Sequence, residues 1–140
     1  MRLKLVMEGD IAMKEKKRQA LAAIETRREQ LGNLSDSLWD HPEVGYHETF
    51  AAQTLAQALE QEGFQVQRGL AGIQTAFSGT FGSGGPVIGF LGEFDALPGL
   101  SQKADCTVQA PVQEGNPGHG CGHNLLGVGS LAAAIAVKQY

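Results

Sequence analysis

The run Gly-His-Gly-Cys-Gly-His-Asn over residues 118–124 constrains this chain more than any other feature. His119, Cys121 and His123 are side chains that bind zinc-like divalent ions, and glycines separate them. Glycine lets the backbone adopt conformations that other residues avoid. The run therefore predicts a metal-ligand loop. A plain glycine-rich turn is one alternative, and a cysteine nucleophile paired with a histidine base is another.

Composition limits the other functional classes. The chain has 140 residues, enough for one modest domain with its own core. Its net charge of −4 argues against nucleic acid as the main partner. No apolar run approaches the length of a membrane span. The two cysteines form no Cys-x-x-Cys pair, and no export signal is recognisable, so a reducing, cytoplasmic setting is favoured.

Hydrophobic spacing predicts helices in the first half of the chain. One helix is expected over residues 11–39, ending near Pro42, because proline disfavours helix in the residue before it. A second is expected over residues 48–62, with Gly63 as its terminating residue. The basic residues of the first helix are interspersed with glutamates, which is typical of a solvated helix face.

Strands are expected to follow these helices. Alternation predicts them over residues 64–67 and 73–81. The apolar run 87–91 predicts a third strand, and the glycine-rich stretch 82–86 before it is expected to be a hairpin turn. That stretch lacks the Gly-Lys-Ser/Thr ending of a phosphate loop.

Asp95 lies just beyond the third predicted strand, where ligands bind in open α/β sheets. It is therefore a candidate functional residue, with a capping role in the following turn as the alternative. Glu93 is expected to point to the opposite side if the strand continues.

The last third of the chain should contain a long loop and a buried helix. Residues 99–118 predict a polar loop, and loops of this length are usually functional or mobile. Residues 125–137 predict a helix that is apolar nearly all round and so should be buried on more than one side. Because the sequence stops three residues later, we expect a truncated protein or a partner that covers this helix.

Three motifs carry a resemblance to a known family. They are Glu-Phe-Asp-Ala-Leu-Pro-Gly-Leu at 93–100, Gly-His-Gly-Cys-Gly-His-Asn-Leu-Leu-Gly at 118–127 and His-Pro-Glu-Val-Gly-Tyr-His-Glu at 41–48. The chain resembles the dinuclear metallo-amidohydrolases of the aminoacylase, hippurate hydrolase and carboxypeptidase group, especially the branch that acts on aminobenzoyl-glutamate. The resemblance extends from the first helix to the last residue.

The resemblance implies an α/β fold of the zinc-peptidase type, with a central, mostly parallel or mixed sheet flanked by helices. Residues 1–10 would be an N-terminal extension, and residues 11–140 the N-terminal portion of the catalytic domain. The dimerisation domain and the C-terminal half of that fold would be absent, so the domain would be truncated.

The resemblance also implies a site with two divalent metal ions, zinc or manganese. Cys121 and His123 map to metal ligands, with the cysteine bridging the two ions. His119 matches only the nearer branch and is a further candidate ligand. Asp95 maps to the aspartate that supports the catalytic site. Asn124 departs from the aspartate of many relatives, which weakens the transfer of that residue's role.

The implied function is hydrolysis of the amide bond of N-acyl- or N-aroyl-amino acids, such as aminobenzoyl-glutamate, or of dipeptides, through a metal-activated water. Partners would be this small-molecule substrate and a second copy, or another chain bound at the last helix. The family's catalytic glutamate lies further downstream, so the 140-residue chain alone is expected to be inactive. A non-catalytic metal- or partner-binding module and a cysteine-dependent enzyme remain as alternatives.

Overall fold

The computed structural model describes residues 15–139 as a small α/β fold. The predicted N-terminal extension and the predicted start of the first helix lie outside the described residues. In chain order, the elements are α2 (Glu15–Glu25), α3 (Arg28–Asp40), α4 (Thr49–Gln61), β1 (Gln65–Arg68), the 3-10 turn η1 (Leu70–Gly72), β2 (Phe77–Thr80) and α5 (His123–Lys138).

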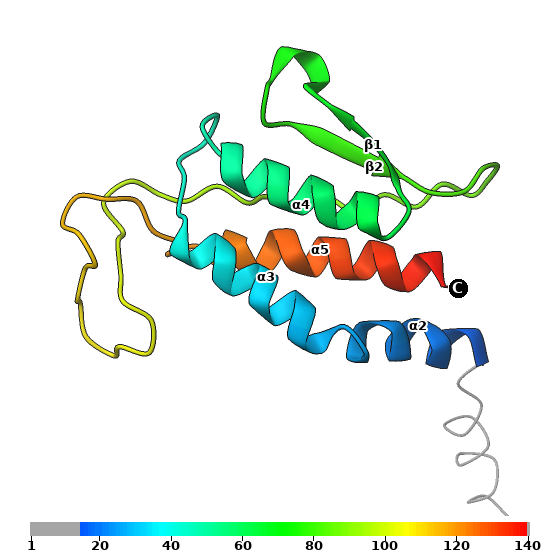
Figure 1. Cartoon of the computed structure of the whole chain (residues 1–140), viewed down its shortest axis with the longest axis horizontal. Coiled ribbons are helices and arrows are strands. Elements are labelled where there is room, and N and C mark those ends of the chain that lie inside the picture. The colour runs from blue at the N-terminus through cyan, green and yellow to red at the C-terminus, as the bar shows by residue number, and fades with distance from the viewer. Residues whose placement is uncertain (1–14, 140) are drawn as a thin grey trace, which may run out of the picture.

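Helix α5 lies at the centre of the fold. It runs between α3 and α4, and the β1–β2 hairpin covers the outer side of α4 (Figure 1). The core forms where these helices meet, around Leu38, Leu55, Val128 and Ile135, each of which is at most 5% exposed. The predicted burial of α5 is confirmed for the face that these residues occupy, whereas its Leu125 and other apolar side chains remain exposed.

The single long helix predicted over residues 11–39 is wrong in one respect, because the described part is broken between α2 and α3. At the break, the Thr26 hydroxyl donates to the carbonyls of Ala22 and Ala23, at 3.0 and 3.2 Å. Arg27 leaves the helical conformation, with φ −107° and ψ 9°. A threonine hydroxyl competes with the backbone for helical carbonyls in this way. The predicted end of the helix before Pro42 is confirmed.

Helix α4 is capped at both ends by specific side chains and turns. The Glu43 carboxylate accepts hydrogen bonds from the backbone N–H groups of Phe50 and Ala51, at 3.1 and 3.0 Å, so it satisfies donors of the first turn. At the other end, Gly63 has a φ of 83°, and Phe64 N–H donates to the Leu59 carbonyl at 3.0 Å. This Schellman ending confirms Gly63 as the terminating residue.

The two strands form an antiparallel hairpin in which Val66 lies opposite Gly79. The strand predicted over 64–67 is therefore confirmed, and that over 73–81 is confirmed in its second half. Gly79 brings the hairpin close to α4, because a Cβ there would lie 2.8 Å from the Leu59 Cδ1 atom. A larger residue at this position would therefore have to displace the Leu59 side chain.

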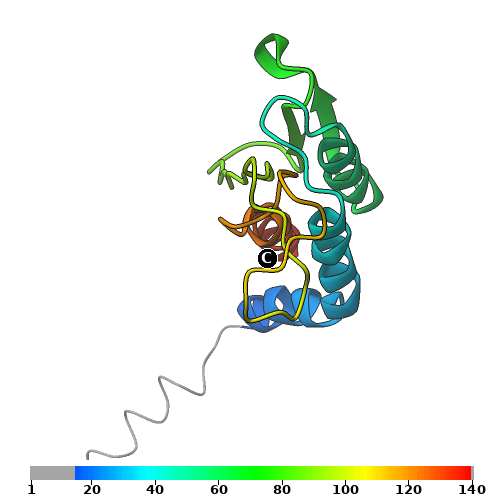
Figure 2. The ribbon, with the colours of Figure 1, turned by 90° about the vertical axis from the view of Figure 1, so that its left-hand side faces the viewer.

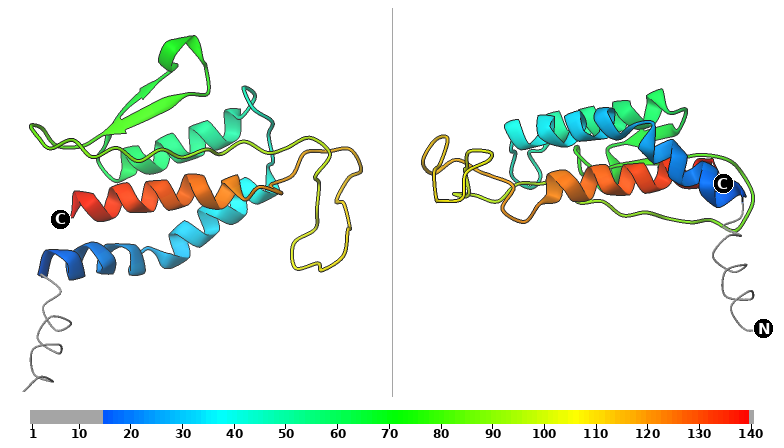
Figure 3. Two further views of the ribbon diagram at one scale, coloured as in Figure 1. Left: turned by 180° about the vertical axis from the view of Figure 1, so that it is seen from behind. Right: turned by 90° about the horizontal axis from the view of Figure 1, so that it is seen from below.

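The central sheet is the main expectation that the structure does not show. Residues 87–91 are extended but form no ladder with any described strand, and the hairpin predicted at 82–86 is not formed. The extended segment instead follows α5 (Figure 3), where the Ser130 hydroxyl donates to the Leu91 carbonyl at 2.7 Å. A strand needs a neighbour to bond its backbone, and Val87 and Leu91 remain 89% and 87% exposed.

The long loop predicted over residues 99–118 is confirmed and is closed on itself. Ser101 N–H donates to the Asn116 carbonyl, and Lys103 N–H to the Ala110 carbonyl, at 3.0 and 2.9 Å. The loop projects from the end of the molecule at which α3 ends and α5 begins (Figures 1 and 2). None of the described helices is long and apolar enough to cross a membrane.

Candidate functional site

Backbone pairing fixes the position of Asp95. On one side, Ala96 N–H donates to the Glu43 carbonyl at 2.7 Å. On the other, Leu97 and Gly118 exchange two backbone hydrogen bonds of 3.0 Å each. The segment that follows Glu93 is thus held between the turn before α4 and the start of the ligand run. Sequence positions 43, 95 and 118 meet at one end of the fold.

Gly118 has a steric reason to be glycine. A Cβ at this position would lie 1.9 Å from the Leu100 carbonyl oxygen, a distance that no real contact reaches. The base of the long loop therefore passes directly over the first residue of the ligand run. Close packing of the loop, and not backbone freedom alone, requires the glycine here.

His123 is the first residue of α5 and lies between two carboxylates. Its Nδ1 is 2.8 Å from Asp95 Oδ1, and its Nε2 is 3.2 Å from Glu93 Oε2. The His123 side chain is 14% exposed, Asp95 31% and Glu93 59%, so the cluster opens to solvent on the Glu93 side. Two of the four candidate residues, Asp95 and His123, are brought into direct contact.

Glu93 was not predicted as a site residue. Its expected direction, away from Asp95, is wrong, because side chains two residues apart in an extended segment point to the same side. Both carboxylates accordingly reach the same imidazole ring. The available signal was the spacing of two residues between Glu93 and Asp95, which places both on one side of an extended segment.

Cys121 is an exposed free thiol. In the part of the chain that the structure describes, no three side chains of His, Cys, Asp or Glu converge closely enough to hold a metal ion together. The structure therefore does not place Cys121 and His123 around one ion. A joint ligand role for them stays a prediction.

His119 is buried, with 5% of its surface exposed. Its Nε2–H donates to the Leu38 carbonyl at 3.1 Å, which ties the ligand run to the last turn of α3. Burial lowers the pKa of the His119 imidazole, because the charged form would lose its hydration. In the neutral ring, Nδ1 then carries a lone pair, and this buried atom has no hydrogen-bond partner.

Asn124 faces α3 rather than the candidate site. It is 5% exposed, and its Nδ2 donates to the Ser35 hydroxyl at 3.0 Å. The amide thus provides a donor between α5 and α3, which a carboxylate would not provide. Asn124 therefore has a local packing role between these two helices.

A buried carboxylate, that of Glu48, lies near the turn that precedes α4. Glu48 is 9% exposed and accepts a hydrogen bond of 2.8 Å from the Thr75 hydroxyl. Gly45 lies between this residue and Asp95, because a Cβ there would be 3.9 Å from Glu48 Oε1 and 3.8 Å from Asp95 Oδ2. Glu48 therefore connects the turn before α4 with the hairpin beside the site.

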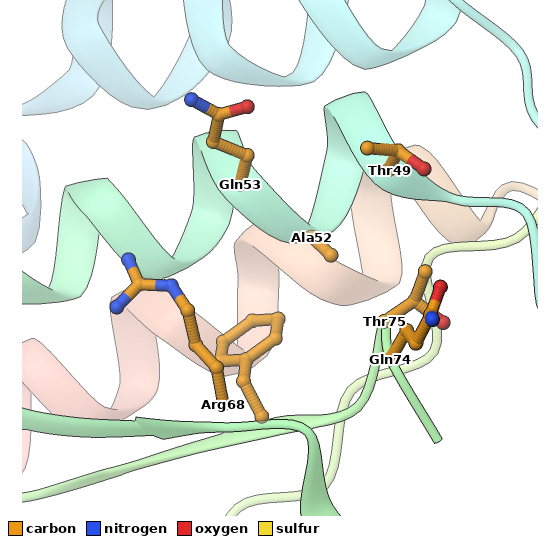
Figure 4. Close-up of a pocket in the computed structure, with 7 residues that line it drawn as sticks. Thr49, Ala52, Gln53, Arg68, Gln74 and Thr75 are labelled. Carbon is orange, nitrogen blue, oxygen red and sulfur yellow. The ribbon is translucent and has the colours of Figure 1, made fainter. Parts of the chain in front are cut away.

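A cavity of about 470 Å³ lies between α4 and the hairpin (Figure 4). Figure 4 shows Gln53 and Thr49 on α4, with Arg68 and Thr75 opposite them. Its lining includes none of Asp95, Cys121, His119 and His123, and the guanidinium of Arg68 is paired with Glu60 at 2.6 Å. We therefore do not assign the candidate chemistry to this cavity.

Comparison with known proteins connects this cluster to a family. No family model matches the chain. The chain is 52% identical over 118 residues to one subunit of the p-aminobenzoyl-glutamate hydrolase of Escherichia coli (strain K12), a match of 84% of this chain and 24% of that protein. It is 33% and 31% identical to the Xaa-Arg dipeptidases of Mus musculus and Homo sapiens, each over 87% of this chain and 27% of the relative.

The chain belongs to the amidohydrolase and peptidase family of these relatives. It spans about a quarter of the length of the curated relatives that it matches. The names of the relatives describe enzymes that hydrolyse amide bonds. Membership of the family confirms the resemblance carried by the three sequence motifs.

Proposed function

We propose that this chain forms part of a metal-dependent amidohydrolase that cleaves the amide bond of N-acyl- or N-aroyl-amino acids, or of dipeptides. The observation that carries the proposal is the His123–Asp95 contact in a chain related to amide-bond hydrolases. Aminobenzoyl-glutamate is the first substrate to test, because the Escherichia coli relative carries that name and shares 52% identity.

The chemistry of the donor atoms fits a divalent metal ion. When His123 donates its Nδ1–H to Asp95, the lone pair of the neutral ring is on Nε2, the atom that lies 3.2 Å from Glu93 Oε2. A carboxylate or carbonyl that fixes the other ring nitrogen is the usual support of a histidine ligand. His119 shows a related arrangement. The Leu38 carbonyl accepts a hydrogen bond from its Nε2–H, and its Nδ1 has no hydrogen-bond partner.

We assign roles to the residues of this chain accordingly. His123 and Cys121 would be metal ligands, with His119 as a further candidate, and Asp95 would fix the tautomer and orientation of His123. A bound zinc or manganese pair would polarise the substrate carbonyl and lower the pKa of a water molecule. The site contains an imidazole, which suits zinc. It also contains carboxylates, which suit manganese.

The same proposal accounts for the contacts that hold Asp95 and the ligand run in place. Asp95 must stay within hydrogen-bond distance of His123 to keep its Nε2 lone pair available. The backbone pairs of Ala96 and Leu97 fix Asp95, and the Leu38 carbonyl fixes the ligand run through His119. These contacts orient the imidazole before any substrate arrives, which favours catalysis.

Activity and partners follow from the family and remain part of the proposal. The chain aligns with about a quarter of each relative, so we expect the 140-residue polypeptide alone to be inactive. The exposed apolar side chains of α5, including Leu125, Leu126 and Val137, offer a surface for a second copy or for another part of the enzyme.

The test is a hydrolysis assay on the product of the complete gene that encodes this chain. Release of aminobenzoate or of free amino acid would be measured with added zinc or manganese, after chelation, and for the His123→Ala variant. We expect turnover that chelation and the variant both abolish. Turnover that survives chelation but is lost in Cys121→Ser would support a cysteine-dependent enzyme instead. Metal binding without turnover would support a non-catalytic module.

A further inference from the structure

We propose that Glu93 is a metal ligand that shares one ion with His123. The inference rests on the proposed function, since it concerns the same site. Glu93 lies within the motif at 93–100, but neither that motif nor the names of the relatives gave it a role. Three observations carry it: the chemistry of the facing atoms, their separation, and the exposure of the pair.

The facing atoms of Glu93 and His123 are both acceptors in the neutral histidine. Asp95 accepts a hydrogen bond from the His123 Nδ1–H at 2.8 Å, so the lone pair of the neutral ring is on Nε2. This nitrogen lies 3.2 Å from the Glu93 carboxylate. Two lone pairs at this distance repel unless a positive species lies between them. A divalent cation would bind both lone pairs.

The separation of the two atoms suits a shared cation. Zinc binds histidine nitrogen and carboxylate oxygen at about 2.0–2.2 Å, which places two ligand atoms of one ion roughly 3–3.5 Å apart. Glu93 Oε2 and His123 Nε2 are 3.2 Å apart. The observed separation therefore matches that of two ligand atoms of one ion.

The surroundings leave the carboxylate of Glu93 available to a cation. Among the described residues, no lysine or arginine forms an ion pair with Glu93, so its charge is not already neutralised. The Glu93 side chain is 59% exposed, which leaves a path from solvent to the pair. Glu93 and His123 are two ligands, and the remaining positions of the ion would be filled by water or by other groups of the enzyme.

The experiment is a titration of the chelator-stripped chain with Zn²⁺, followed by calorimetry, and with Co²⁺, followed by its visible absorption. Glu93→Gln keeps the size of the side chain and removes the ligand charge. Glu114→Gln is the matched control, because it removes the same charge from an exposed residue of the long loop. Circular dichroism would confirm that each variant is folded.

We expect Glu93→Gln to weaken Zn²⁺ binding by about 100-fold or more, since loss of even an outer partner of a ligand costs 10–100-fold. The Co²⁺ spectrum should change as well, while Glu114→Gln should match the wild type in both measurements. Equal affinity and an unchanged spectrum in Glu93→Gln would overturn the inference and leave the proposed function standing. If the wild type binds neither ion, the proposed metal site of this chain fails together with the inference.

Discussion

Glu62 joins three helices, and its replacement is the sharpest test of how the fold is held. Its carboxylate accepts two hydrogen bonds from Arg27, at 2.5 and 3.1 Å, and lies 3.4 Å from Lys138 Nζ. Arg27 lies at the break between α2 and α3, and Lys138 is the last residue of α5. The Glu62 side chain is only 12% exposed, so solvent screens these contacts little.

We expect Glu62→Gln to lower the free energy of unfolding by about 2 kcal/mol at pH 7. Removing one partner of a fully buried ion pair costs about 3–5 kcal/mol, and the value here is smaller because Arg27 keeps 28% of its side chain exposed. For a domain of this size the loss corresponds to roughly 6–10 °C in Tm. Urea unfolding followed by circular dichroism would measure it.

The effect should also depend on pH in a defined direction. The Arg27 hydrogen bonds hold the pKa of Glu62 below its ordinary value. Its stabilisation is therefore present above the pKa of the unfolded chain, about 4.3, and is lost as the pH falls through the lower pKa of the folded state. The difference between wild type and Glu62→Gln should shrink below about pH 4.

Glu60→Gln is the matched control on the same helix. Glu60 pairs with Arg68, but both side chains are more than 40% exposed, so the unfolding midpoint should hardly change. If Glu60→Gln destabilised the chain as much as Glu62→Gln, the argument from burial would be refuted. A difference for Glu62→Gln that stayed constant down to pH 3 would refute the argument from the carboxylate charge.

Three further substitutions test separate parts of the structure. Gly118→Ala should cost roughly 3 kcal/mol in urea unfolding, because its methyl group would overlap the Leu100 carbonyl; a cost near zero would contradict the contact. Leu38→Ala should cost about 2–5 kcal/mol, since Leu38 is fully buried, and an unchanged midpoint would exclude it from the core. Asp95→Asn should weaken Zn²⁺ binding about 10–100-fold through the orientation of His123, and unchanged affinity in calorimetry would contradict that role.

Local signals in the sequence were sufficient for most helices. The terminating role of Gly63 and the end of α3 before Pro42 were predicted correctly, because each depends on the conformational limits of one residue. The break at Thr26 was not predicted. The apolar spacing continues through it, and the interruption arises from a side-chain hydroxyl that bonds the helix backbone.

The extended segment over residues 87–91 shows where local signals fail. Its composition is that of a strand, but a ladder depends on a neighbour that the sequence pattern does not specify. Glu93 was missed for a different reason: its spacing of two residues from Asp95 puts both side chains on one side of an extended segment, and the prediction overlooked this. Asp95 and His123 were found from their local sequence, as a residue after a predicted strand and a ligand in a glycine-rich run, and the family resemblance supported both. Their contact of 2.8 Å joins residues 28 positions apart.

The central claim is that the run of residues 118–124 binds metal, and metal content tests it most directly. Elemental analysis would be performed on the chain purified without chelators and on a Cys121→Ser/His123→Ala double variant. The account predicts stoichiometric zinc or manganese in the wild type and its loss in the variant. Equal metal content in the two proteins, or none in the wild type, would contradict it.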